Sequence, residues 1–153
     1  MTRMGTTSPG VRDTRNISKD VANSALAERV LKIDAQLIEK DARYIRHRLS
    51  LSCEISVAPD EEGHLIAEFK FKDANTGNYL FLKEVDATDL AEESGIPLSS
   101  IGWLAGLTAA ESLADYTKDM SLNRRIDKLW SNIALGILRT EGISHDGHPS
   151  YSR

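Results

Sequence analysis

The chain has 153 residues, 41% of them hydrophobic and 27% charged, and its formal net charge at pH 7 is −4. This length suffices for one domain with a modest core, and the composition excludes a wholly disordered protein. The single cysteine, Cys53, excludes an internal disulfide, and no stretch approaches the roughly 20 apolar residues of a membrane span, so we expect a cytoplasmic protein.

Both ends of the chain have the composition of flexible tails. Residues 1–17 are rich in Thr, Ser, Gly and Arg, without apolar periodicity and without the apolar core of a secretory signal. Residues 143–153 are rich in Ser, His, Gly and Pro. We therefore expect a single domain over residues 18–142.

A long helix is predicted from Ser18, a typical N-cap residue, to about residue 50. Its apolar side chains form two rows with the three- and four-residue spacing of a helix. The first row consists of Leu26, Val30, Ile33 and Leu37, and the second of Leu31, Ile38, Ala42, Ile45 and Leu49. Such a helix would span roughly 50 Å, whereas a compact domain of this size is roughly 35 Å wide. We therefore expect a partner to cover part of its apolar surface.

Three strands are predicted next. Apolar and polar residues alternate over 51–57 and 65–72, which is the pattern of half-buried strands, and residues 79–85 form a third run of strand-forming residues. The turn-forming stretches 59–63 and 73–78 separate them. Short connections favour pairing between neighbours, so we expect a three-stranded antiparallel meander.

Helical periodicity returns after the strands. A short helix over 88–94 is expected to end at Gly95, a second helix to run from Pro97 to about Asp119, and a third to cover about 121–141 before Gly142. The predicted fold class is therefore α+β, with a long N-terminal helix, the antiparallel meander and three C-terminal helices. We interpret the acidic stretch 86–119 and the basic cluster Arg43, Arg46, His47 and Arg48 as solvated faces.

Residues 88–106 resemble the helix-turn-helix of many bacterial repressors. The resemblance rests on Ala91, Gly95, Leu98, Ile101 and Leu104. It implies that Ser99 and Ser100 face DNA bases, with Arg124 and Arg125 available for the phosphates. However, the positions that would read bases carry no Arg, Lys, Asn or Gln, and residues 86–119 hold seven acids against one base. DNA binding is therefore the alternative function.

Small residues in the second predicted C-terminal helix indicate close approach by another element. Gly102 and Gly106 are each less favourable in a helix than Ala, by about 1 kcal/mol of helix stability. The approaching element is either another part of this chain or a partner, and Trp103 would anchor the contact in either case.

Catalytic motifs are missing from the sequence, and we expect neither a metal nor a cofactor. Cys53 is expected to behave as a small apolar residue, and the pair His145 and His148 lies in the predicted C-terminal tail. An enzyme would have to use scattered residues on the polar face of the sheet, for which the candidates are Glu68, Lys70, Tyr79 and Lys83.

The predicted function is therefore non-enzymatic binding of another protein, as an adaptor, regulator or inhibitor that acts as a homodimer. Secretion chaperones, immunity proteins and anti-defence inhibitors are similar in being small, acidic and α+β. We expect no membrane contact. The predicted partner-binding residues are Leu31, Ile38, Ile45, Leu49, Gly102, Trp103 and Gly106.

Overall fold

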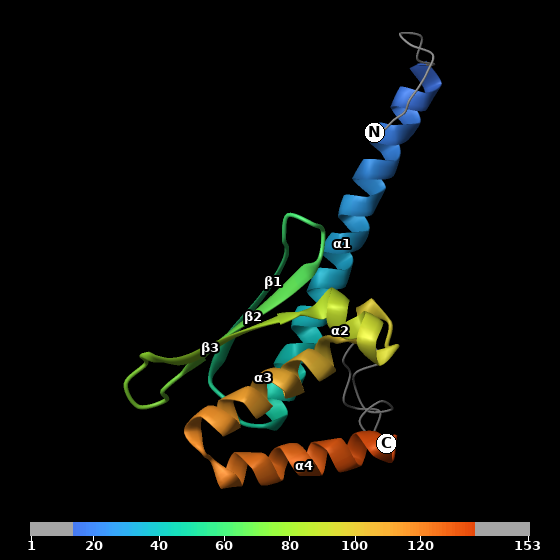
Figure 1. Cartoon of the computed structure of the whole chain (residues 1–153). Coiled ribbons are helices and arrows are strands. Elements are labelled where there is room, and N and C mark those ends of the chain that lie inside the picture. The colour runs from blue at the N-terminus through green and yellow to red at the C-terminus, as the bar shows by residue number, and fades with distance from the viewer. Residues whose placement is uncertain (1–13, 137–153) are drawn as a thin grey trace. The chain divides into compact units, whose positions relative to one another are not determined.

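The computed structural model describes residues 14–136, with the side chains of the first helix described from residue 24 onward (Figure 1). The elements in chain order are α1 (Thr14–Arg48), β1 (Cys53–Pro59), β2 (Leu65–Lys72), β3 (Tyr79–Asp86), α2 (Ala87–Ser94), the 3-10 turn η1 (Leu98–Ser100), α3 (Gly102–Thr117) and α4 (Met120–Ala134). This order confirms the predicted α+β class. The chain divides into two compact units, residues 1–33 and residues 34–153.

The described part of the first unit is helical. Helix α1 already includes residues 14–17, so the predicted flexible tail is wrong for these four residues, while residues 1–13 lie outside the described chain. Within residues 14–136, no helix is both long enough and apolar enough to cross a membrane.

The second unit contains the antiparallel sheet, in the order β1-β2-β3. Its register places Ile55 opposite Phe69 and Phe69 opposite Lys83. Because side chains alternate across a sheet, one face carries the buried row Ile55, Phe69 and Phe71. This face forms one apolar core with Ala42 and Ile45 of α1, Leu49 just after it, helix α3 and the buried side of α4.

Two arginines of α1 bind the outer edge of β1. Arg43 donates a hydrogen bond to the backbone oxygen of Ile55 at 3.2 Å, and Arg46 donates one to that of Cys53 at 3.0 Å. The prediction of a solvated face is therefore corrected for Arg46, which is half-buried, whereas Arg43 contacts the strand edge and remains exposed. An unpaired strand edge exposes hydrogen-bonding groups that invite a further strand, and the two guanidinium groups occupy them here.

The helix ends follow local backbone chemistry. Gly95 adopts a left-handed conformation (φ 75°) at the end of α2, as predicted. The helix expected to begin at Pro97 instead starts as the 3-10 turn η1 and becomes α-helical only at Gly102. Helix α4 ends at Ala134 rather than near residue 141, because Gly136 has a φ of 81° that no helix can continue through. Gly142 lies outside the described residues.

Candidate functional site

The first apolar row of α1 is exposed except at Leu37, which is half-buried. Leu26, Val30 and Ile33 expose 51%, 48% and 55% of their surface. Spacings of four and three residues place the three side chains on one side of the helix. All three belong to the first unit, and we call them the exposed α1 row. Apolar residues gathered in this way are typical of a surface that contacts another protein.

The second row of α1 is buried instead. Ile38, Ile45 and Leu49 are at most 1% exposed, and Leu31 is half-buried. The structure therefore corrects the assignment of these three residues to a partner-binding surface, because other residues of the same chain cover them. The strongly exposed large apolar side chains of α1 therefore belong to the first row, at Leu26, Val30 and Ile33.

Gly102 and Gly106 are also buried, and α1 is the element that approaches them. A Cβ atom at Gly102 would lie 2.8 Å from Cβ of Asp41 and would clash with the carbonyl oxygen of Ile38. A Cβ atom at Gly106 would lie 3.1 Å from Cβ of Ile45. The small residues therefore serve helix packing within the chain, and the structure corrects their assignment to a partner surface.

Trp103 is buried between helices as well. It is 6% exposed, and its ring meets that of Trp130 edge-on, with the ring centroids 6.1 Å apart. Its predicted role as an anchor for a partner is therefore corrected too, since the ring packs against α4 of the same chain.

The helix-turn-helix-like segment offers little surface for reading DNA. Ser99 and Arg124 are exposed, and Ser100 is half-buried. Arg125 donates a hydrogen bond to the backbone oxygen of Leu49, so its guanidinium group already has a partner within the chain. Gly102 and Trp103 are buried, and none of the residue types that make bidentate base contacts (Arg, Lys, Asn and Gln) stands at Ser99 or Ser100.

The polar face of the sheet brings together three of the four residues proposed for an enzyme. Lys70 Nζ lies 3.7 Å from a carboxylate oxygen of Glu68 and 5.8 Å from the ring centroid of Tyr79. Lys83 does not belong to this group, because its register position opposite Phe69 places it on the other face.

The same polar face is hollowed near one end. The hollow has a volume of about 460 Å³ and is lined by Ser56, Ala58, Pro59, Asp60, Ile66, Glu68 and Glu84. Ser56, Glu68 and Glu84 lie side by side across the three strands. Two carboxylates are thus direct cross-strand neighbours, an arrangement that disfavours the sheet.

Cys53 faces the core, as its place in the strand pattern predicts. Burial raises the pKa of its thiol to about 11, and the nearby Arg46 and Arg43 only partly oppose this effect. A thiol that stays protonated at neutral pH is a weak nucleophile. The prediction that Cys53 behaves as a small apolar residue agrees with this environment.

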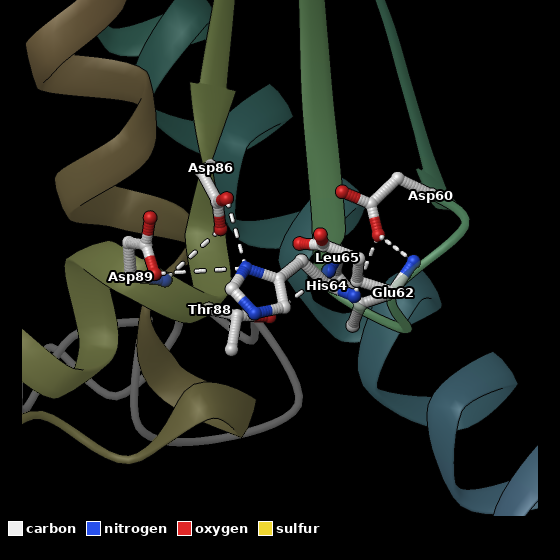
Figure 2. A network of polar contacts seen from close by, with 7 residues as sticks. All are labelled: Asp60, Glu62, His64, Leu65, Asp86, Thr88 and Asp89. Carbon is white, nitrogen blue, oxygen red and sulfur yellow. Dashed lines mark hydrogen bonds and ion pairs between the residues drawn. The ribbon is translucent and has the colours of Figure 1, made fainter.

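A histidine and three aspartates converge beside the hollow (Figure 2). His64 stands just before β2, Asp86 ends β3, and Asp89 lies in the first turn of α2. Nδ1 of His64 is 3.0 Å from Oδ2 of Asp86 and 3.5 Å from Oδ1 of Asp89. Asp60, in the turn between β1 and β2, lines the hollow as well. We call these four residues the His64 cluster.

The charges of the His64 cluster shift the pKa values of its members. The hydrogen bond that His64 donates to Asp86 is the main cause of a raised pKa at His64, with further contributions from the negative charges of Asp86, Asp89 and Asp60. Burial alone would raise the pKa of Asp86, but the backbone amide of Asp89 and the ring of His64 together lower it. The cluster is therefore an acidic site built around a single imidazole.

Sequence reasoning missed the His64 cluster because its members are spread over 30 positions of the chain. The predicted meander could nevertheless have indicated that His64 and Asp86 lie close together. In an antiparallel meander the turn before the second strand lies beside the end of the third, and Ile66 indeed pairs with Asp86. The pair His145 and His148 lies outside the described residues.

No protein-family model, curated protein or solved structure matches the chain.

Proposed function

We propose that this protein is a non-enzymatic protein-binding regulator, adaptor or inhibitor, and that it acts as a homodimer through the exposed α1 row. The observation that supports the proposal is the exposure of Leu26, Val30 and Ile33 on one side of a helix. A helix face of this kind buries its apolar side chains best against the same face of a second copy. A cytoplasmic location belongs to the same proposal.

The second row of α1 supports this choice of surface. Ile38, Ile45 and Leu49 are already covered within the chain, so the partner surface is reduced to the part of α1 that precedes residue 34. The two apolar faces of the helix thus have different roles. One completes the core, and the other is available to a second copy.

The contribution of a single residue can be worked out from burial. Burying a whole valine side chain stabilises by about 1.5–3 kcal/mol. Val30 is about half exposed, so the two copies in a dimer together contribute an amount in the same range. Since about 1.4 kcal/mol corresponds to a tenfold change in affinity, Val30→Glu should weaken dimerisation at least about tenfold.

The test is sedimentation equilibrium of the full chain over a range of concentrations. Ser24→Glu is the matched control, because it adds the same charge at another exposed position that the helical spacing places away from the row. We expect the wild type and Ser24→Glu to dimerise alike and Val30→Glu to be shifted toward monomer. A monomeric wild type at micromolar concentration, or equal dimerisation of all three proteins, would refute the proposal.

A further inference from the structure

We infer that Asp60, His64 and Asp86, assisted by Asp89, form a binding site for a divalent transition-metal ion such as Zn²⁺ or Mn²⁺. Each of Asp60, His64 and Asp86 offers one ligand atom, and these atoms all lie within 4.8 Å of one another. They come from the β1–β2 turn, the start of β2 and the end of β3, so the meander itself assembles the site (Figure 2).

The distances suit a small metal ion. Ligands bound at about 2.0–2.2 Å in tetrahedral or octahedral geometry stand roughly 3.0–3.5 Å apart. The separations from Nδ1 of His64 to the oxygens of Asp86 and Asp89 are 3.0 and 3.5 Å. An ion bound at this point would therefore require little movement of these three side chains. The ligand atom of Asp60 lies within 4.8 Å of those of His64 and Asp86, so Asp60 would move closer to complete the site.

Backbone amides hold two of the carboxylates in place. Oδ1 of Asp60 accepts hydrogen bonds from the amides of Glu62 and His64, both at 2.9 Å. Oδ1 of Asp86 accepts one from the amide of Asp89 at 3.0 Å and thereby caps α2. In each case one oxygen orients the carboxylate. The other oxygen of Asp86 lies 3.0 Å from Nδ1 of His64, and an ion bound to both atoms would replace that hydrogen bond. Such outer contacts are what positions the ligands of metal sites.

A hydrogen bond between His64 and Asp86 does not account for the whole cluster. Nδ1 carries at most one proton, so it can donate to Asp86 or to Asp89 but serves only one of them well. Three carboxylates around one imidazole also leave excess negative charge even when the ring is protonated. A divalent cation would satisfy both carboxylates and offset that charge.

The donor types indicate which metals fit. Carboxylate oxygens alone favour Mg²⁺ or Ca²⁺, whereas an imidazole nitrogen favours Zn²⁺ and its neighbours in the first transition row. Asp60 also lines the hollow on the sheet's polar face, so one side of the site is open to solvent. The protein would supply three or four ligands, and water would complete the coordination.

The experiment is isothermal titration of the full chain with ZnCl₂ in a phosphate-free buffer. All variants carry His145→Gln and His148→Gln, so that this sequence pair contributes no binding. We expect one ion per chain at micromolar affinity and at least a tenfold loss of affinity for His64→Gln. His47→Gln is the matched control, since His47 is an exposed histidine outside the cluster, and it should bind as the parent does.

A second measurement separates ligation from loss of folding. With Mn²⁺ as a paramagnetic probe, the backbone amide signals of His64 and Asp89 should broaden first in the parent and not in His64→Gln, whose circular dichroism should be unchanged. Absence of saturable Zn²⁺ binding below about 100 μM, or equal binding by parent and His64→Gln, would overturn the inference. The oligomeric state of the chain does not bear on this result.

Discussion

Among the described residues, Asp41 is a charged side chain buried in the core, and its replacement by asparagine should change stability more favourably at high pH than at low pH. It is 3% exposed and lies on α1 against the start of α3, where a Cβ atom at Gly102 would touch it. Burial raises the pKa of its carboxyl group to about 7, and the neighbouring Lys40 opposes this only in part. In the unfolded chain the group has its ordinary value of 3.8.

The direction in which pH changes the stability follows from how many protons the folded and unfolded chains bind at Asp41. Between pH 3.8 and about 7 the folded chain holds a proton on Asp41 that the unfolded chain releases, so rising pH favours unfolding throughout this window. Each pH unit costs about 1.4 kcal/mol. The full penalty, reached above pH 7, is therefore at most about 4 kcal/mol. Two of these pH units lie between pH 5 and pH 7, so the wild type should lose about 3 kcal/mol of folding stability over that range because of Asp41.

The assay is urea denaturation of the wild type and Asp41→Asn at pH 5 and at pH 8, followed by circular dichroism. Burying the amide of asparagine has a cost that does not depend on pH, so it cancels when the two pH values are compared. The free energy of unfolding of the variant, relative to that of the wild type, should therefore be up to about 3 kcal/mol higher at pH 8 than at pH 5. Asp115→Asn, at an exposed position on α3, is the matched control for loss of a charge. A difference that is the same at pH 5 and pH 8 would refute the reasoning.

Two further predictions concern packing and the sheet. Gly102→Ala should destabilise the protein by about 2 kcal/mol or more, measured by thermal or urea unfolding, because the added methyl group meets rigid backbone of α1. A cost below about 0.5 kcal/mol would show that the two helices separate easily. Glu84→Lys should stabilise the sheet by about 0.2–1 kcal/mol at low salt, because residue 84 lies directly opposite Glu68. A gain that persists unchanged in 1 M NaCl would contradict this electrostatic explanation.

Local patterns predicted the elements well. Alternation over 51–57 and 65–72 located β1 and β2 to within about two residues, because the two-residue period is imposed by the strand backbone itself. Gly95 was identified as a helix cap for a similar reason, since its left-handed conformation is a local property. The predicted end of α4 near residue 141 is wrong because the sequence has glycines at both 136 and 142, and helical periodicity does not show which of them adopts the left-handed conformation.

Long-range relations were predicted less well. Periodicity shows that a helix face is apolar, but it does not reveal whether the same chain covers that face, so Ile38 and Leu26 could not be distinguished. The cluster of His64 with Asp60 and Asp86 depends on strand register, which is set by tertiary pairing. Local sequence patterns therefore could not predict the candidate site, although they did predict the fold that creates it.

The outer edge of β1 is covered by arginines only if the end of helix α1 is folded. Arg43 and Arg46 reach the strand only while the last turns of α1 are formed. If that helix end unwound, the backbone oxygens of Cys53 and Ile55 would become available as a template for a strand from another molecule. The groups that cover this strand edge are thus encoded ahead of the sheet in the chain, in the helix that immediately precedes it.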